Sequence, residues 1–503
     1  MPQQYLKKIL TSRVYDVARE TPLDQAFGLS RRLGYKVWLK REDSQDVFSF
    51  KIRGAYNKMA QLPEEVLKRG VVAASAGNHA QGVAMAAQHL KCQATIFMPV
   101  TTPTIKVAAV RNRGAKIKLT GDTYDETSVA AATFCEENDQ TYIPPFDDPD
   151  IIAGQGTIGI ELLNQHAGEI EAIFVPVGGG GLISGIATYI KQLRPKIKII
   201  GVEPEDAASM TASLKKGRRV TLPHVGQFAD GVAVRTVGKE TFRICRRCVD
   251  DMVVVSTDEM CAAIKDIFED TRSITEAAGA LAVAGLKKYV QSGHSINGDL
   301  IAISTGANMN FDRLRHVSER AEIGERREAI LCVTIPEKPG SFRAFCRMIG
   351  RRSVTEFNYR YADTEKAQIY VGLSVSDDAD IDGLVQKLDE RGYATVDLTD
   401  NELAKEHIRH MVGGRAPRID DEMLFRFLFP ERPGALSKFL DTLGDRFNIS
   451  LFHYRNHGAD YGRVLCGIQV PDESRKLLKT FLDKLGYEYS DESDNVAYRL
   501  FLG

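Results

Sequence analysis

The last third of this 503-residue sequence repeats itself with a period of 94 or 95 residues. Tyr359 and Tyr454 lie 95 residues apart, each in a Phe-x-Tyr-Arg segment. Three more pairs recur at nearly the same offset, namely the Pro-Gly steps at Pro339 and Pro433, the glycines Gly372 and Gly467, and the Gly-Tyr steps at Gly392 and Gly486. Four landmarks at one spacing predict a duplicated structural unit rather than a single large fold.

Each copy has the pattern of a small α+β unit. The order is strand, Pro-Gly turn, helix, strand, strand, helix and strand, which is typical of a ferredoxin-like arrangement. A polar stretch from Gly413 to Asp421 joins the two copies. We therefore expect three domains, at residues 1–325, 326–420 (including the join) and 421–503.

The residues before the repeat alternate short apolar runs with helical patterns. The expected strands are Lys36–Lys40, Gly70–Ala74, Ala94–Met98, Lys116–Leu119, Ala172–Val177, Lys198–Val202, Asp251–Val255 and Leu300–Ser304. The helical patterns between them include Ala80–His89, Ile105–Asn112, Ser128–Asp139 and Leu182–Gln192. Apolar strands separated by helices form parallel sheets, and these strands are too many for one compact sheet. We expect two open α/β lobes that bind ligands at the carboxyl ends of their strands.

Composition narrows the class of protein. Lys and Arg total 66 and Asp and Glu total 67, so the net charge of −1 gives no field that would gather nucleic acid or an anionic membrane. The basic cluster from Lys215 to Arg219 is interpreted as a solvated turn. No apolar run approaches the roughly 18 residues of a membrane span, and the first residues show no signal peptide, so we expect a cytoplasmic protein.

Cysteine usage gives no sign of disulfides or metal. Eight cysteines in a chain of this length are too sparse for a disulfide scaffold. Cys245 and Cys248 form a C-x-x-C pair, but no second pair or nearby His pair completes a zinc set. We interpret them as two thiols on one helix and predict no metal site.

A lysine stands at the start of a helical pattern in the segment 49–55, Ser-Phe-Lys-Ile-Arg-Gly-Ala. Such a lysine is usually a surface residue. If Lys51 is buried, however, desolvation disfavours its ammonium form and lowers its pKa. The free amine is then available for Schiff-base chemistry.

Four consecutive glycines, Gly178 to Gly181, join an apolar strand to a helix that begins near Leu182. Backbone N–H groups of such a loop can converge on a phosphate. The lysine of the G-x-x-x-x-G-K-[ST] motif is absent, which disfavours a nucleoside triphosphate. No acidic residue closes a strand about twenty residues further on in the dinucleotide manner, although Glu203 comes close. A small phosphorylated cofactor is the preferred interpretation.

The segment Ser75-Ala76-Gly77-Asn78-His79 follows another apolar strand. Ser and Asn at a helix start are ordinary capping residues. Free N–H groups at this position would also suit a substrate carboxylate, and Asn78 can hydrogen-bond a cofactor hydroxyl. His79 is interpreted as a structural residue rather than a base.

These three segments together resemble the threonine dehydratase family of fold-type II pyridoxal-phosphate enzymes. The resemblance extends over essentially the whole chain, because the biosynthetic members also carry a C-terminal region of two ACT-like units. It implies a pyridoxal-phosphate-dependent catalytic domain at 1–325 and two regulatory ACT-like units after it.

The resemblance also implies residue roles. Lys51 would hold the cofactor as an imine and act as the catalytic base, with Phe50 against the ring. The phosphate would be surrounded by Gly178, Gly179, Gly180, Gly181 and Leu182, and the substrate carboxylate by Ser75, Ala76, Gly77, Asn78 and His79. Asn78 would also contact the phenolic oxygen of the cofactor. Thr305 would face the ring nitrogen, with Ser304 as the neighbouring alternative.

Two positions depart from related sequences. Ala277 stands where relatives often have Pro, which leaves the role of the adjacent Glu276 open. Ser209 replaces an acidic ligand of the cation that related serine racemases bind near the equivalent of Glu203. A cation needs several oxygen ligands, so we predict none here.

The implied reaction is elimination of water from L-threonine, giving 2-oxobutanoate and ammonia, with L-serine reacting similarly. Isoleucine would inhibit and valine would oppose it, at an effector surface near Tyr359 and Tyr454 of a homotetramer. The alternatives are an L-serine dehydratase, a β-replacement enzyme such as threonine synthase, and an amino-acid sensor with a decayed catalytic lobe. The tail could also be a purely structural duplication. The intact Lys51, Asn78 and glycine segment, together with the double tail, favour the first reading of the function.

Overall fold

The computed structural model describes residues 2–336, 345, 348–349, 352, 354–359, 365–410, 421–430, 438–439, 442–443, 447–455 and 461–502. The chain forms two compact units, Met1–Val317 and Ser318–Gly503. We call the second of these the tail. Helix α14 (Arg313–Gly324) spans the division, and the domain boundary that we expect at residue 325 directly follows this helix.

The first unit contains two sheets. The larger has the order β1-β2-β10-β7-β8-β9 and is parallel except for β1, while the smaller has the order β5-β4-β3-β6 and is parallel throughout. The strands are β1 (Leu23–Gln25), β2 (Val37–Arg41), β3 (Val71–Ala74), β4 (Ala94–Met98), β5 (Lys116–Leu119), β6 (Thr141–Tyr142), β7 (Ile170–Pro176), β8 (Lys198–Pro204), β9 (Asp251–Val255) and β10 (Asp299–Ser304). The prediction of two α/β lobes is confirmed.

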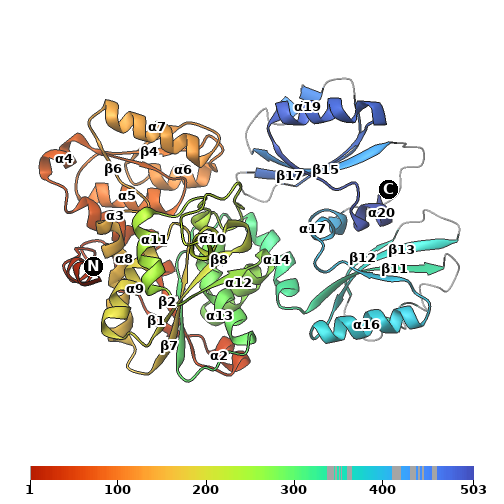
Figure 1. The fold of residues 1–503 in the computed structure, drawn as a ribbon, viewed down its shortest axis with the longest axis horizontal. Helices are drawn as coiled ribbons and strands as arrows, with labels where there is room; N and C mark the ends of the chain where they lie inside the picture. Colours follow the sequence, from red (N-terminus) through yellow and green to blue (C-terminus); the bar gives the residue numbers. More distant parts are fainter. Residues whose placement is uncertain are drawn as a thin grey trace. The chain divides into compact units, whose positions relative to one another are not determined.

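Helices cover both sheets (Figure 1). They are α1 (Pro2–Leu10), α2 (Phe27–Leu33), α3 (Lys51–Met59), α4 (Glu64–Arg69), α5 (Asn78–His89), α6 (Thr104–Arg111), α7 (Tyr124–Glu137), α8 (Pro149–Gln165), α9 (Gly181–Leu193), α10 (Ser209–Lys216), α11 (Lys239–Cys248), α12 (Thr257–Thr271) and α13 (Ala277–Gln291). Short 3-10 turns include η1 (Glu42–Ser44) and η3 (Asp230–Val232).

Strand periodicity decides which helix covers which face of the smaller sheet. Val71 and Ala73 belong to the core that includes side chains of α3 and α5, whereas Val72 and Ala74 pack with α7. Successive side chains of a strand point to opposite faces, so α7 lies on the face opposite α5. Both faces are apolar, which explains why β3 has no polar residue.

The Ala- and Gly-rich run in α13 permits close approach of this helix to the larger sheet. A Cβ atom at Gly285 would collide with the side chain of Val202 in β8. The run Ala277–Leu286 is buried along its whole length. Small residues therefore bring α13 against the strands whose carboxyl ends carry the candidate site.

The tail contains two four-stranded antiparallel sheets of identical topology, β12-β13-β11-β14 and β16-β17-β15-β18. The first is built from β11 (Glu328–Pro336), β12 (Val354–Tyr359), β13 (Lys366–Ser374) and β14 (Thr395–Asp397), and the second from β15 (Glu422–Pro430), β16 (Asn448–Arg455), β17 (Tyr461–Gln469) and β18 (Glu488–Asp491). Strand order 2-3-1-4 is that of a ferredoxin-like unit, so the predicted duplication is confirmed. The two Pro-Gly turns and residues 411–420 of the join lie outside the described residues.

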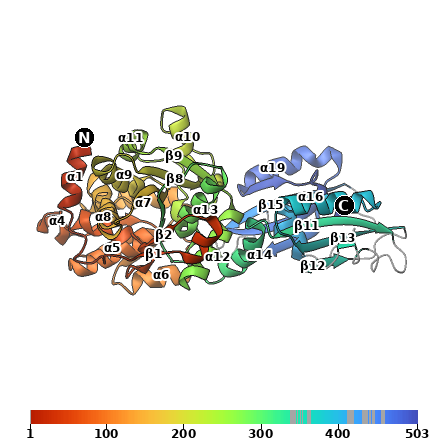
Figure 2. The same cartoon turned by 90° about the horizontal axis from the view of Figure 1, so that it is seen from below.

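One face of each sheet of the tail packs against helical residues. Helix α16 (Asp378–Glu390) covers the first sheet and α19 (Arg475–Leu485) the second, as Figures 1 and 2 show. The described part of these cores also includes the helical residues Phe345 and Ile349 in the first copy and Phe439 and Leu443 in the second. The other faces share a core with α17 (Glu402–Glu406) and α20 (Val496–Phe501), to which Tyr370 and Leu465 contribute from the two copies. The copies therefore form a single folded body within the tail.

Among the described residues, no helix is both long and apolar enough to cross a membrane.

Candidate active site

The segment before Lys51 is held against the end of β10. The Phe50 N–H donates to the carbonyl oxygen of Thr305 (3.3 Å), and the Ala307 N–H donates to the carbonyl oxygen of Phe48 (2.9 Å). These bonds bring together two motifs that lie about 255 residues apart in the sequence. Lys51, the first residue of α3, therefore starts its helix beside Thr305.

The Lys51 amine lies in an environment that lowers its pKa. Its Nζ donates to the carbonyl oxygen of Pro145 (3.0 Å). Burial lowers the pKa of Lys51 to about 8, and the nearby Glu276 carboxylate opposes part of that shift. An amine with this pKa can act as a nucleophile and as a base near neutral pH.

Residues 178–181, called here the glycine loop, connect β7 to the N-terminus of α9. The backbone N–H groups of residues 178 to 182 donate to no other group in the described part of the chain. A Cβ atom at Gly179 would overlap the ring of Phe146, and Gly180 has a φ of +92°. Unpaired donors at the start of a 13-residue helix are the arrangement that accepts a phosphate, so these residues fit a phosphorylated cofactor.

One tripeptide, Pro145-Phe146-Asp147, supports both the lysine and the glycine loop. The Pro145 carbonyl accepts from the Lys51 amine, and the Phe146 ring lies against the loop. The Asp147 carboxylate caps α11 by accepting the N–H groups of residues 239, 240 and 241 at 2.8–3.2 Å. From that helix, the Thr241 hydroxyl donates to the Gly179 carbonyl oxygen (2.6 Å).

Asn78 is the first residue of α5 and does not cap it. The N-cap is Gly77, which makes no side-chain cap hydrogen bond. Instead the Asn78 amide nitrogen donates to Glu276 Oε1 (2.5 Å). The neighbouring His79 is buried, and burial followed by the charge of Lys51 lowers its pKa to about 3. His79 Nε2 lies 2.8 Å from the Ile143 carbonyl oxygen, so the ring is held by a contact with the backbone.

The end of β10 supplies two hydroxyl groups. The Thr305 hydroxyl donates to the Ala278 carbonyl oxygen (3.1 Å), which uses its only proton in this conformation. The Ser304 hydroxyl is fully buried and has no hydrogen-bond partner among the described residues. These two hydroxyl groups are the candidates for the partner of a ring nitrogen.

A loop that sequence reasoning missed closes one side of this group of residues. The 3-10 turn η3 places Val232 against Gly178 and Gly231 close to Glu276 and Asn78. Asp230 in the same turn pairs with Lys106 of the smaller lobe and lies 3.6 Å from Arg313. The loop has neither periodicity nor a catalytic motif, so the sequence offered no signal for it.

Charges around η3 also set the ionisation of Glu276. Burial acts to raise the pKa of Asp230, but Lys106 and Arg313 outweigh it and hold that pKa at about 2. Burial, reinforced by the resulting negative charge of Asp230, raises the pKa of Glu276 to about 7. Glu276 is therefore a carboxyl group that changes charge near neutral pH, 2.5 Å from the Asn78 amide.

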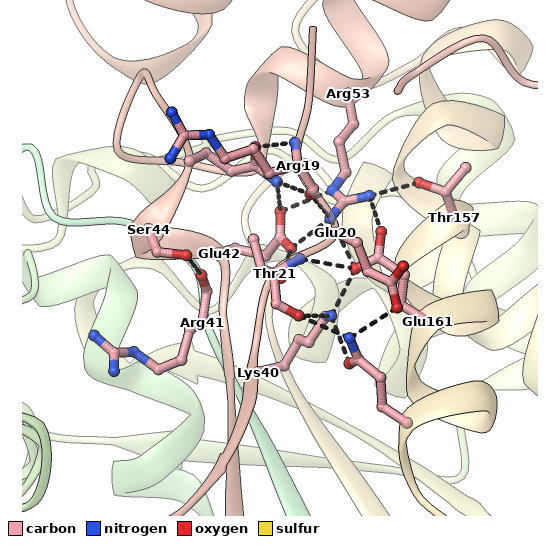
Figure 3. Close-up of polar contacts among 12 residues, drawn as sticks. Arg19, Glu20, Thr21, Lys40, Arg41, Glu42, Ser44, Arg53, Thr157 and Glu161 are labelled. Carbon is pink, nitrogen blue, oxygen red and sulfur yellow. Dashed lines mark hydrogen bonds and ion pairs between the residues drawn. The ribbon is translucent and has the colours of Figure 1, made fainter. Parts of the chain in front are cut away.

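Lys40, Glu42, Arg53 and Glu161 form a buried ion cluster (Figure 3). Arg53 belongs to α3, the helix that begins with Lys51. The Arg53 guanidinium pairs with Glu42 at 2.8 Å and with Glu161 at 2.5 Å, and Lys40 pairs with Glu161 at 2.6 Å. Two cations balance two carboxylates, which satisfies charges that would otherwise be costly to bury. The cluster ties α3 to β2, η1 and α8.

No group of three or more potential metal ligands occurs among the described residues. Cys245 and Cys248 lie on α11, where Cys245 is buried beside Ser184 (3.6 Å). The Glu203 carboxylate accepts the N–H groups of Met210 and Thr211 at 2.8 Å each, which occupies both of its oxygens. These residues are therefore explained by packing and hydrogen bonding.

Comparison with known proteins identifies the class of enzyme to which the chain belongs. Residues 14–306 match the family described as pyridoxal-phosphate-dependent enzymes. Residues 319–408 and 413–502 each match the C-terminal regulatory domain of threonine dehydratase. The two matches to the regulatory domain coincide with the two copies seen in the tail.

Full-length relatives narrow the class to one family. A biosynthetic L-threonine dehydratase of Burkholderia multivorans is 56% identical over 99% of both chains. The enzyme of that name from Escherichia coli is 52% identical over 99% of this chain and 97% of its own. The solved structure of the processed form of threonine deaminase isoform 2 from Solanum lycopersicum has a TM-score of 0.63 and 53% identity, covering 64% of this chain and 88% of that one. The chain belongs to the threonine dehydratase family of pyridoxal-phosphate-dependent enzymes, which confirms the predicted family and cofactor.

Proposed function

We propose that this chain converts L-threonine to 2-oxobutanoate and ammonia, with Lys51 as the catalytic residue. The observation that carries the proposal is the Lys51 amine, with its pKa lowered to about 8, hydrogen-bonded beside a phosphate-accepting glycine loop. The relatives described above, named for this activity, support the choice of substrate. L-Serine, one methyl smaller, is expected to react at the same site.

The residues that would hold pyridoxal phosphate come from four segments. We assign the phosphate to the N–H groups of Gly178, Gly179, Gly180, Gly181 and Leu182, the ring face to Phe50, the phenolic oxygen to Asn78, and the ring nitrogen to Thr305. When bound, the cofactor supplies an electron sink for the electron pair that remains on the substrate Cα after its proton is removed. A neutral hydroxyl at the ring nitrogen keeps that sink shallow, which favours elimination over transamination.

The chain's own groups position the substrate and move its proton. We assign the substrate carboxylate to the segment Ser75–His79 at the start of α5. The N–H groups of Ser75 and Gly77 are used by the Phe97 carbonyl oxygen and the Ser75 hydroxyl. Those of Ala76, Asn78 and His79 donate to no other group in the described part of the chain. Lys51 Nζ, once released from the cofactor, removes the Cα proton of threonine. Loss of the β-hydroxyl as water leaves an enamine, which hydrolyses to 2-oxobutanoate and ammonia.

The direct test is Lys51→Ala, followed by 2-oxobutanoate formation from threonine. We expect no turnover and no absorbance from lysine-bound cofactor. Lys51→Arg should not restore either, because a guanidinium stays protonated and forms no imine. Production of 2-oxobutanoate at the wild-type rate by Lys51→Ala would refute the assignment.

A substrate comparison separates the alternative functions. A serine dehydratase would give a higher kcat/KM for serine than for threonine, and a β-replacement enzyme would need an added nucleophile before it released product. A decayed sensor would form no 2-oxo acid from either amino acid. We expect threonine to be the better substrate without any added nucleophile.

We further propose that the tail binds isoleucine as inhibitor and valine as antagonist. Tyr359 and Tyr454 occupy equivalent places in the two copies, since Tyr359 pairs with Ile369 across β12 and β13 and Tyr454 pairs with Val464 across β16 and β17. Matching positions in duplicated sheets support a pair of related effector sites. Equilibrium dialysis with labelled isoleucine tests this directly.

We propose a homotetramer in the cytoplasm. Closed symmetry is the rule for oligomers of this kind, and light scattering measures the mass. The relatives include proteins named as chloroplastic and as mitochondrial, so fractionation of the source cell tests the compartment.

A further inference from the structure

Four polar side chains form a continuous hydrogen-bonded chain that joins three segments of the sequence. We call Glu276, Asn78, Asn308 and Gln81 the amide chain. Asn78 Nδ2 donates to Glu276 (2.5 Å), Asn308 Nδ2 donates to Asn78 Oδ1 (2.7 Å), and Gln81 Nε2 donates to Asn308 Oδ1 (3.0 Å). Asn78 and Gln81 lie three residues apart on one face of α5.

Chemistry fixes the direction of the amide chain independently of how the amide atoms are assigned. Asn308 Nδ2 also donates to the Val47 carbonyl oxygen (2.8 Å), and a carbonyl oxygen can only accept. The NH2 group of Asn308 must therefore face Val47, and its second N–H faces Asn78. Asn78 must then present its oxygen to Asn308 and its NH2 group to Glu276.

This arrangement leaves Asn78 with one free N–H. One of its two donors is used by Glu276, and its oxygen is used by Asn308. If the amide rotated by 180°, its oxygen would meet the Glu276 oxygen and its NH2 group would meet the NH2 group of Asn308. The contact between the two NH2 groups is repulsive whatever the ionisation of Glu276, and the contact between the two oxygens is repulsive when Glu276 is ionised. The surrounding side chains therefore hold a single orientation.

We propose that Glu276 and Asn308 are positioning residues, which orient the Asn78 amide so that its remaining N–H is presented to the phenolic oxygen of the cofactor. The inference rests on the proposed role of Asn78. It gives a function to Glu276, to Asn308 after Gly306 and Ala307, and to Gln81, which lies three residues after Asn78. Gly306 leaves room for the Glu276 carboxylate, since a Cβ at this position would press on its Oε1.

The test uses Asn308→Asp, measured by cofactor affinity and by the visible spectrum of the bound cofactor. An aspartate cannot donate to Val47 or to Asn78, so the Asn78 amide loses its fixed orientation. We expect about tenfold weaker binding of pyridoxal phosphate to the apo-protein, the loss typical of one hydrogen bond to a charged oxygen, and a shifted absorbance maximum. If Asn308→Asp does not fold, Asn308→Ala removes the same donors without adding a charge.

Asn57→Asp is the matched control. Asn57 is fully buried, donates to the Asp150 carbonyl oxygen (2.7 Å) and accepts from the Arg13 N–H (3.0 Å), but belongs to α3 and not to the amide chain. The same loss of a buried donor should lower the melting temperature while leaving cofactor affinity and absorbance at wild-type values.

A double-mutant cycle with Asn78→Ala separates the possible failures. We expect Asn308→Asp to have no further effect on affinity or absorbance once Asn78 is absent. If Asn78→Ala alone changes neither quantity, the proposed role of Asn78 is wrong. If Asn78→Ala changes both but Asn308→Asp changes neither, or changes them equally in the Asn78→Ala background, the positioning inference is overturned while the proposed function stands.

Discussion

The lowered pKa of Lys51 predicts how the rate of cofactor capture depends on pH. Only the unprotonated amine can form the imine. With a pKa of about 8, roughly 9% of Lys51 is unprotonated at pH 7, compared with about 0.03% for a lysine at the usual value of 10.5. The unprotonated fraction of Lys51 at pH 7 is thus about 300-fold that of an unperturbed lysine, and imine formation at Lys51 should be faster for this reason.

The shape of the pH profile is more diagnostic than the absolute rate. The unprotonated fraction of Lys51 should rise about fivefold from pH 7 to 8, about twofold from pH 8 to 9, and little beyond. An unperturbed lysine would instead gain about tenfold per pH unit up to pH 10. The assay mixes apo-protein with saturating pyridoxal phosphate and follows the appearance of imine absorbance.

Two controls isolate the lysine. The same reaction with Nα-acetyl-lysine, measured at each pH, corrects for ionisation of the cofactor itself. Glu276→Gln removes the carboxylate that raises the pKa of Lys51, so the midpoint should move to lower pH. Glu203→Gln changes another buried glutamate whose pKa is raised to about 7 by burial, but which makes no contact with Lys51, and should leave the midpoint in place. A rate that climbs tenfold per unit to pH 10 would refute the reasoning.

Four further perturbations test other parts of the structure. Gly179→Ala forces a Cβ against the ring of Phe146 and should weaken cofactor binding at a cost of about 1–3 kcal/mol, measured by titration of the apo-protein. Thr305→Ser should be mild, whereas Thr305→Asp should slow dehydration and raise transamination; equal behaviour would point to Ser304 as the ring nitrogen partner. Arg53→Met leaves two buried glutamates without their main cation and should lower the unfolding free energy by about 3–5 kcal/mol in chemical denaturation. A chain ending at Gly324 should still form 2-oxobutanoate but ignore isoleucine, and inhibition that persists would place the effector site before residue 325.

Hydrophobic patterning was sufficient to predict the main strands. Each of the eight expected strands corresponds to an observed strand, and Ala94–Met98, Lys116–Leu119 and Asp251–Val255 agree at both ends. The strands β1 and β6 were missed because they have three and two residues, too few to show an alternation. A strand this short is specified by the neighbour with which it pairs, as β1 is by β2.

The loops that surround the candidate site could not be predicted. Residues 145–147 and 230–232 contact the glycine loop from segments that are 30 to 50 residues distant in the sequence. Neither segment has periodicity, and neither contains a recognisable motif. Their positions depend on how the two lobes pack together. The pattern of residue types along the sequence carries no information about that packing. The motifs at the ends of β3, β7 and β10, by contrast, were predicted because each directly follows an apolar run that is recognisable as a strand.

The segment 49–55 shows how a motif combines several physical requirements. Lys51 faces the Pro145 carbonyl in the site, whereas Arg53, two residues later, enters the buried ion cluster on another side of the same helix. Gly54 lets α3 and α8 approach each other closely. A Cβ atom added at Gly154 of α8 would lie only 2.8 Å from the Cα atom of Gly54. The reactive amine thus sits at the end of a helix fixed by two buried ion pairs and a close helix–helix contact. Lys51 supplies the reactive amine, and Arg53, two residues later, holds the helix in place. Substituting Arg53 should therefore disturb the orientation of Lys51 as well as the stability of the fold.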